Sequence, residues 1–154
     1  MTVHTITREQ FVPAPVADVF AFFSSPENLS KLTPPGLGFA ILTPSPIAMK
    51  QGALIDYTIR VFGLRVRWTT LITAYDPGRS FVDEQLRGPY SFWHHSHRFE
   101  AAPGGTLVRD DVRYALPFGP LGGLARFFFV KRQLDSIFDF RTRTIRTLFG
   151  GDAT

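Results

Sequence analysis

The sequence predicts an α+β fold, in which a mostly antiparallel sheet of six to seven strands packs against one long C-terminal helix. Between residues 39 and 116, apolar residues recur at many second positions, which is the period of a strand with one buried face. From Leu121 to Phe149 they recur at spacings of three and four, which is the period of one helix face. At about 1.5 Å per residue this helix would be roughly 40 Å long, so it needs a broad apolar partner such as the sheet.

The residues around the C-terminal helix agree with this period. Pro117, Gly119 and Pro120 keep the preceding segment out of a helix, and Gly150 and Gly151 offer the left-handed conformation that ends one. The apolar face of the helix is expected to contain Leu124, Phe127, Val130, Leu134, Ile137, Phe138, Ile145 and Leu148.

One strand and two short helices are expected near the N-terminus. Residues 3–12 are rich in β-forming residues with partial alternation, and this run stops at Pro13. Pro15 then opens a helix whose apolar residues lie three and four apart up to Phe23, with Asp18 in the first turn, where the helix dipole favours an anion. Pro26 begins a second short helix that is expected to reach residue 32.

The middle of the chain is typical of a meander of strands joined by short turns, which implies antiparallel pairing. The expected strands cover residues 39–43, 53–62, 66–72, 80–86, 91–101 and 106–116. Gly63 and Leu64 are expected to form a two-residue turn, because glycine at the first position suits the primed turn that matches strand twist. In that register Ile59 lies opposite Trp68.

Composition restricts the class of protein. The chain has 154 residues and no cysteine, so we expect a single domain over residues 1–150 without disulfides or thiolate metal sites. No apolar run approaches the roughly 20 residues of a membrane span, and Arg8 and Glu9 stand where a signal peptide would be apolar. We therefore expect a cytoplasmic protein without integral membrane association. The sequence carries no signal for an oligomeric state.

The net charge of +4 does not by itself indicate a nucleic-acid partner, and we expect none. The basic residues are scattered except on the C-terminal helix, where several are expected to form a solvated face. The alternative role for these side chains is contact with a phosphate group or a lipid surface. Sixteen phenylalanines predict a thick core, or a core that contains a cavity.

The order of strand, two helices, antiparallel meander and long terminal helix resembles the helix-grip fold of the START-like superfamily, also called SRPBCC. Four local segments narrow the resemblance to one subgroup of this superfamily. They are DEQLRGPYSFWHHSHRFE from Asp83 to Glu100, the Gly-Gly turn after it, the Pro-Phe-Gly-Pro segment and IFDFR. They are similar to bacterial ligand-binding or polyketide cyclase/dehydrase-like members. The resemblance implies a curved sheet that wraps the terminal helix and leaves a deep pocket between them. Binders and enzymes share this fold, so it does not decide function.

A histidine cluster on one strand is the main candidate for a chemical site. Strand alternation places Trp93, His95, His97 and Phe99 on one face, which we expect to point toward the helix. A register that pairs Phe99 with Val108 would pair His97 with Asp110, His95 with Val112 and Trp93 with Tyr114, and a slip of two would bring His95 beside Asp110. In both registers a carboxylate meets an inward histidine.

Three interpretations of this cluster remain open. His95 and His97 lie at i and i+2, about 7 Å apart along the strand, and can share a metal if Asp110 or Asp83 supplies a third ligand. A histidine whose tautomer is fixed by Asp110 suits general acid-base catalysis. The third interpretation is a pair of buried histidines whose ring nitrogens are hydrogen-bonded to neighbouring groups. No metal or cofactor is expected. Arg141 interrupts the apolar helix face, and either pairs with Asp110 or Asp83 or extends to the rim.

The predicted function is binding of a small hydrophobic or aromatic ligand, lipid- or polyketide-like, in a pocket between the sheet and the C-terminal helix, without a cofactor. The expected ligand-binding residues are Tyr57, Trp68, Trp93, His95, His97, Tyr114, Leu134, Phe138 and Arg141. One alternative is a cofactor-independent enzyme of the cyclase or dehydratase type, in which His95 or His97 acts with Asp110. Another is a protein-interaction module that uses exposed edges of the fold.

Overall fold

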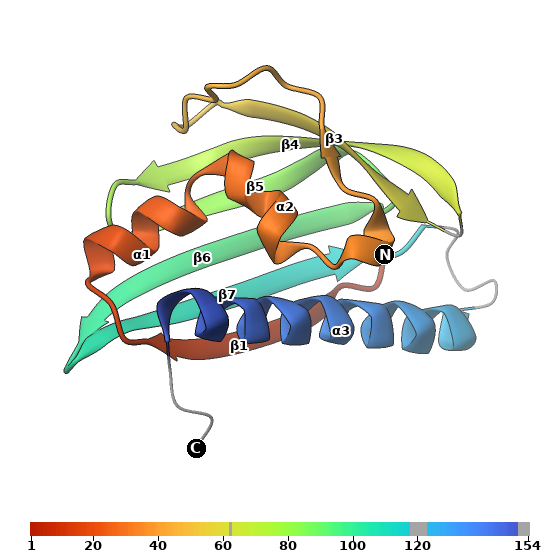
Figure 1. Ribbon diagram of the computed structural model, residues 1–154. Helices are drawn as coiled ribbons and strands as arrows, with labels where there is room; N and C mark the ends of the chain where they lie inside the picture. The colour runs from red at the N-terminus through yellow and green to blue at the C-terminus, as the bar shows by residue number, and fades with distance from the viewer. Residues whose placement is uncertain (62, 118–122, 151–154) are drawn as a thin grey trace.

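The computed structural model describes residues 1–61, 63–117 and 123–150, and Figure 1 shows their arrangement. The strands are β1 (His4–Val12), β2 (Ala40–Ile41), β3 (Leu54–Val61), β4 (Leu64–Asp76), β5 (Ser80–Arg87), β6 (Phe92–Ala102) and β7 (Gly105–Ala115). The helices are α1 (Val16–Phe23), α2 (Leu29–Leu32) and α3 (Gly123–Phe149), with 3₁₀ turns η1 (Pro26–Asn28) and η2 (Pro35–Leu37). The expected order of elements is therefore confirmed.

The seven strands form one antiparallel sheet in the order β1-β7-β6-β5-β4-β3-β2. Figure 1 shows that the sheet curves, and that α1, α2 and α3 all lie on the same side of it. Helix α3 runs along the β1 end of the sheet, where β1 and β7 are neighbours. This is the helix-grip arrangement that the order of elements predicted.

The core lies between the sheet and the helices, because the inward residues of the strands are apolar. One cluster joins Phe20 of α1 to Phe81, Phe99 and Ile145. A second contains Trp68, Trp93, Val112, Tyr114, Leu134 and Phe138. Leu134 and Phe138 are 3% and 6% exposed, so the expected packing of the C-terminal helix on the sheet is confirmed.

Two members of the expected apolar face of α3 are exposed instead. Leu124 is 74% exposed and Leu148 is 51% exposed. At about 100° per residue, Leu124 lies roughly 80° around the helix from Leu134, so a spacing of ten residues takes it off the buried face. Leu148 lies roughly 60° around the helix from Ile145, in the last turn of α3.

The predicted register of β3 against β4 is wrong by two residues. Val61 pairs with Leu64 and Ile59 pairs with Val66, whereas the prediction placed Ile59 opposite Trp68. Gly63 has a φ of +75°, and Leu64 already belongs to β4. The chain therefore reverses one residue earlier than expected, and Gly63 occupies the second position of the turn. Moving a turn by one residue along the chain changes the pairing of the two strands by two residues.

Two registers of β6 against β7 were left open by the sequence, and the structure has the one without the slip. Phe99 pairs with Val108, His97 with Asp110 and His95 with Val112. The turn between these strands is short and glycine-rich, with Gly104 at a φ of +81°. A short turn leaves little freedom to slip, so the histidines and the carboxylate of Asp110 are held on one face.

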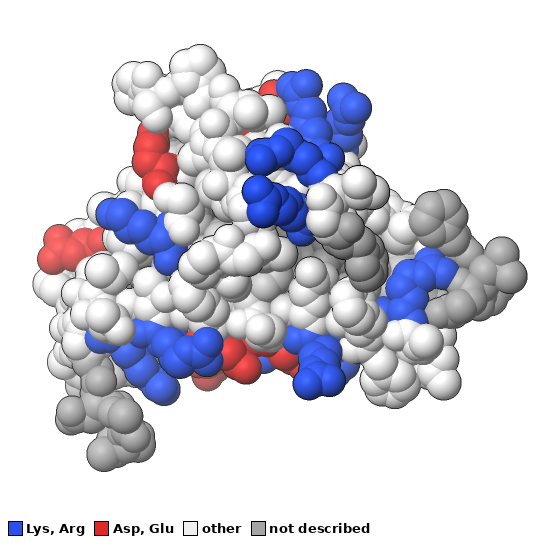
Figure 2. Space-filling model, turned by 45° about the vertical axis from the view of Figure 1, so that its right-hand side comes forward, with Lys and Arg blue, Asp and Glu red and all other residues white. Residues whose placement is uncertain are grey.

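Charged side chains on the surface occur in separate groups. Figure 2 shows Lys and Arg around a large uncharged area, and mixed with acidic residues along the lower edge, where α3 lies. On that helix Lys131 pairs with Asp135 at 2.9 Å, and Arg8 of β1 reaches both Asp135 and Asp139. These pairs agree with a solvated helix face. Among the described residues, no helix is both long enough and apolar enough to cross a membrane.

The contrast between Ile145 and Leu148 on α3 yields a stability prediction. Ile145 is fully buried in the cluster that joins α1 and the sheet, so Ile145→Ala should lower the free energy of unfolding by about 2–5 kcal/mol. Leu148→Ala removes a similar side chain from an exposed site and should change it by less than about 0.5 kcal/mol. Urea unfolding followed by circular dichroism measures both values, and equal losses would contradict the described packing of α3.

Candidate functional site

A cavity of about 630 Å³ lies between the sheet and α3. Strands β3, β4, β5 and β6 form one wall, and α2 with the following segment and one side of α3 form the others. Most of the lining side chains are apolar, among them Leu29, Leu32, Leu37, Phe39, Ile55, Ile59, Ile72, Phe81 and Ile137. No lining residue comes from β1 or β7, so the cavity lies over the half of the sheet that α3 does not cover closely.

Eight of the nine expected ligand-binding residues line this cavity. They are Tyr57, Trp68, Trp93, His95, His97, Leu134, Phe138 and Arg141. Tyr114 points inward as expected but does not line the cavity, because it lies on β7 and its ring is covered by Tyr90 and by His4 of β1. It is 1% exposed and belongs to the core.

Aromatic rings form one end of the cavity. Tyr57 stacks on Trp68 with ring centroids 5.8 Å apart, and Trp93 meets Trp68 edge to face at 5.3 Å. Tyr90 lies 4.9 Å from the Trp93 ring. Burial raises the pKa of both Tyr57 and Tyr90, so their phenols stay neutral. The Nε1 atom of Trp68 is buried and has no hydrogen-bond partner within the described part of the chain.

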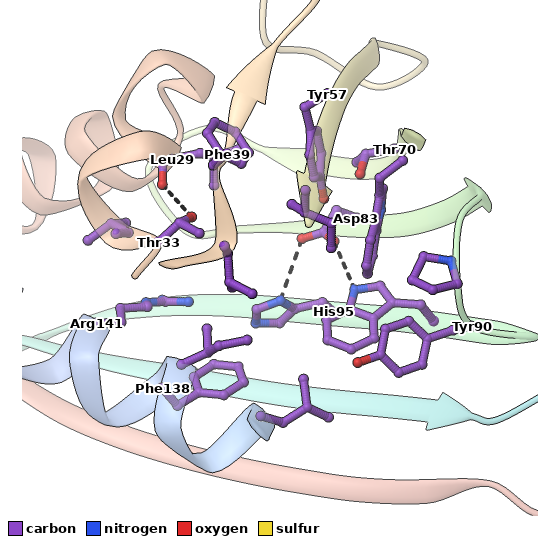
Figure 3. Close-up of a pocket in the computed structure, with 18 of the residues that line it drawn as sticks. Leu29, Thr33, Phe39, Tyr57, Thr70, Asp83, Tyr90, His95, Phe138 and Arg141 are labelled. Atoms are coloured by element: carbon purple, nitrogen blue, oxygen red, sulfur yellow. Dashed lines mark hydrogen bonds and ion pairs between the residues drawn. The ribbon is translucent and has the colours of Figure 1, made fainter. Parts of the chain in front are cut away.

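A cluster of two histidines and two carboxylates forms the polar part of the site. The rings of His95 and His97 stack with centroids 3.7 Å apart, because both project from the same face of β6. Asp83 of β5 lies on one side, with Oδ2 at 2.5 Å from His97 Nε2 and 3.7 Å from His95 Nδ1. Asp110 of β7 lies on the other side, with Oδ1 at 2.8 Å from His95 Nε2 and 3.2 Å from His97 Nδ1. Figure 3 shows Asp83 beside His95, with Phe138 and Arg141 projecting from α3.

Arg141 completes the cluster from the helix. Its Nη2 atom lies 3.0 Å from both carboxylate oxygens of Asp110, so of the two partners expected for this cation the structure selects Asp110. The guanidinium also lies over the Phe23 ring, 4.6 Å from its centroid. The side chains of Arg141 and Asp110 are 12% and 8% exposed, so the ion pair is largely shielded from water.

The carboxylates of the cluster are held in the ionised form. Burial alone would raise the pKa of Asp110, but the charge of Arg141 and hydrogen bonds with His95 and His97 hold this pKa well below its usual range. Burial likewise opposes ionisation of Asp83, but the charge of His95 and the hydrogen bond from His97 outweigh burial and lower its pKa.

The two histidines differ in their affinity for a proton. Burial lowers the pKa of His95, and the neighbouring charge of His97 lowers it further. Burial also opposes a charge on His97, but its hydrogen bonds and charge interactions with Asp110 and Asp83 outweigh burial and raise its pKa. With His97 protonated and His95 neutral, the two carboxylates face one imidazolium and one guanidinium. The formal charge of the cluster is then zero.

Several residues of the site were not among the expected ligand-binding residues. Tyr90, Leu37 and Phe39 line the cavity, but no local pattern shows that a loop or a turn folds over the pocket. Asp83 was expected only as a partner for a metal or for Arg141. The register of β5 against β6 pairs Asp83 with His95 and so places the carboxylate beside the histidines. Working out this register from the sequence would have identified Asp83 as a site residue. Asp83, His95 and His97 are also the residues of the described chain with the geometry to hold a metal ion.

The cluster predicts a measurable difference between the two histidines. Followed by proton NMR in the presence of a chelator, His97 should titrate above about 6.5 and His95 below it. Asp110→Asn removes a charge that favours both imidazolium forms, so both midpoints should fall. Asp111→Asn is a suitable control, because Asp111 pairs with Thr7 and Arg98 on the opposite face of β7. Two midpoints near 6.5 that do not respond to Asp110→Asn would contradict the described contacts.

Comparison with known proteins agrees with the fold. The family described as polyketide cyclase / dehydrase and lipid transport matches residues 12–141. No curated protein matches the sequence. Among solved structures, the Zhui aromatase/cyclase from Streptomyces sp. R1128 is 15% identical with a TM-score of 0.73, covering 94% of this chain and 92% of that one.

Two further solved structures show the same fold. Protein CV1439 from Chromobacterium violaceum is 14% identical with a TM-score of 0.72, covering 96% of this chain and 98% of that one. A START superfamily protein from Mycobacterium smegmatis is 13% identical with a TM-score of 0.69, covering 94% and 99%. Because the family match spans most of the sequence, this chain belongs to the polyketide cyclase / dehydrase and lipid transport family, of the START-like or SRPBCC type.

Proposed function

We propose that this protein binds a small hydrophobic or aromatic molecule, lipid- or polyketide-like, in the cavity between the sheet and α3. The observation that carries the proposal is the cavity itself, whose volume of about 630 Å³ lies in the range of small-molecule sites and whose wall is mainly apolar. A buried apolar wall favours an apolar ligand because its binding removes nonpolar surface from water.

The polar groups of the cavity indicate what the ligand carries besides its apolar body. The unpartnered Nε1 of Trp68 is a hydrogen-bond donor, and a buried donor without a partner costs about 1–3 kcal/mol. A ligand oxygen that accepts this hydrogen would remove the cost. Asp83, His95 and His97 line the sheet wall of the cavity, Arg141 lines it from α3, and together they offer both donors and acceptors. A ring system or chain with hydroxyl or carbonyl oxygens fits this combination.

Filling the cavity tests the location of the site. A fluorescent apolar probe should bind the wild-type protein with roughly micromolar affinity, about 8 kcal/mol. Leu134→Trp places a larger side chain in the lining and should weaken binding at least tenfold, while the far-ultraviolet circular dichroism stays that of the folded domain. Fluorescence titration measures the affinity.

The matched control introduces the same side chain on the same helix outside the cavity. Leu124 is exposed and does not line the pocket, so Leu124→Trp should leave the probe affinity within about twofold of wild type. If Leu134→Trp folds and binds the probe as well as Leu124→Trp does, the ligand site lies elsewhere.

A second candidate function is acid-base catalysis of a cyclisation or dehydration. The observation that favours it is the contact of His95 with Asp110 beside a second histidine, both lining the cavity. A protonated His97 can donate the Nε2 proton to a substrate oxygen that takes the place of Asp83, and a neutral His95 can accept a proton at Nδ1, so adjacent rings provide the acid and the base.

Asp110→Asn separates binding from catalysis. The substitution keeps the volume but removes the charge that orients both histidines, so turnover of a polyketide-like substrate should fall by an order of magnitude or more. Affinity for the apolar probe should stay within about threefold, because Asp110 does not line the cavity. Product formation and probe binding are measured on the same preparation. Unchanged turnover would exclude this acid-base mechanism and leave the binding function standing.

A further inference from the structure

We propose that Asp83, His95 and His97 form a binding site for one divalent transition-metal ion of the Zn²⁺ type on the wall of the cavity. The three donor atoms come from two adjacent strands, β5 and β6, and all lie within 4.8 Å of one another. Two imidazole nitrogens and one carboxylate oxygen are a donor set that such ions prefer. This inference departs from the sequence-based expectation of no metal, and it does not depend on which organic ligand fills the cavity.

The two separations between Asp83 and the histidine nitrogens require only a small adjustment for a metal ion. Donors of a tetrahedral ion at about 2.0–2.1 Å lie about 3.3 Å apart. Asp83 Oδ2 lies 3.7 Å from His95 Nδ1 and 2.5 Å from His97 Nε2. The first separation must shorten and the second must lengthen, each by less than about 1 Å, which rotation of the carboxylate and the stacked rings can provide. The short contact is a hydrogen bond that the ion would replace.

The groups behind the histidines are those of a supported metal site. A histidine that binds a metal usually directs its other ring nitrogen at a carboxylate or a carbonyl, which fixes its tautomer. Asp110 is hydrogen-bonded to His95 Nε2 at 2.8 Å, and its Oδ1 atom lies 3.2 Å from His97 Nδ1, an ion-pair distance without hydrogen-bond geometry among the described residues. Arg141 in turn fixes Asp110 through both carboxylate oxygens. The nitrogens that face Asp83 are therefore free to act as ligands once the short hydrogen bond is replaced.

The remaining coordination positions would face the cavity. Three protein ligands and an open position are the arrangement of catalytic zinc sites, whereas structural sites are closed by four. Asp83, His95 and His97 all line the cavity, so the open position is accessible to its contents. With a divalent ion, neutral histidines, the two carboxylates and Arg141, the cluster carries a formal charge of +1. An oxygen anion such as hydroxide, a carboxylate or an enolate would neutralise it.

The same atoms can instead share a proton, and metal titration distinguishes the two. Protein without a polyhistidine tag is stripped with a chelator, and Zn²⁺ and Co²⁺ are added separately in calorimetric titrations. We expect one ion per chain, and visible absorption of the Co²⁺ form that reports tetrahedral or five-coordinate ligands. Zn²⁺ should also shift the ring resonances of His95 and His97 in NMR spectra of the wild type and leave those of His94 unchanged.

Variants identify the ligands. Asp83→Asn and His97→Gln each remove one donor and should weaken binding by more than about tenfold. The controls are Glu84→Gln and His94→Gln, which should bind the ions as wild type does. Glu84 and His94 are register partners whose side chains lie on the opposite face of the same two strands. Circular dichroism verifies that each variant is folded.

Three results would overturn the proposal. The first is the absence of saturable binding of both ions by folded wild-type protein, which would leave the cluster as a proton-sharing network. The second is unchanged affinity in folded Asp83→Asn. The third is a Zn²⁺-induced shift at His94 rather than at His95 and His97, which does not require any variant to fold.

Discussion

The buried ion pair between Arg141 and Asp110 is the interaction on which the site depends. Asp110 lies inside the protein on β7, where an unpaired carboxylate would be strongly disfavoured, and Arg141 reaches it from α3 with both oxygens at 3.0 Å. Removing one partner of such a pair typically costs about 3–5 kcal/mol, because the other charge is left alone. The pair thus joins the helix to the sheet and also fixes the carboxylate that orients His95 and His97.

Further polar contacts join α3 to β1, and they help to explain where the cavity lies. Arg8 of β1 pairs with Asp135 and Asp139, at 32% exposure of its own side chain. Exposed pairs of this kind contribute about 0.2–1 kcal/mol each, so they position the helix more than they stabilise it. Together with the Arg141 pair they hold α3 over β1 and β7. The inward residues of β3 to β6 then face the other side of the helix across a gap, and α2 and the following segment cover that gap.

The parts of the site that could be predicted from the sequence are those fixed by local rules. Strand alternation placed His95 and His97 inward, and both registers that the sequence left open brought a histidine beside Asp110. At the β3–β4 turn the same reasoning failed, because a glycine can occupy either position of a two-residue turn and the sequence did not show which. Tyr114 could not be assigned correctly by alternation. It points inward as Trp93 does and belongs to the same core cluster, but only Trp93 also lines the cavity.

The formal charge of the cluster restricts the head group that a ligand can present to it. When one of the two histidines is protonated, the cluster of two carboxylates, one imidazolium and one guanidinium is neutral. Hydroxyl or carbonyl oxygens of a ligand can then approach it without leaving a charge uncompensated. A bound anion would then need a further proton, which the low pKa of both carboxylates opposes. A divalent ion in place of the proton raises the charge by one and favours an anionic oxygen. Because such coupling is reciprocal, an anionic ligand would increase the affinity for the ion by the same factor by which the ion increases the affinity for the ligand.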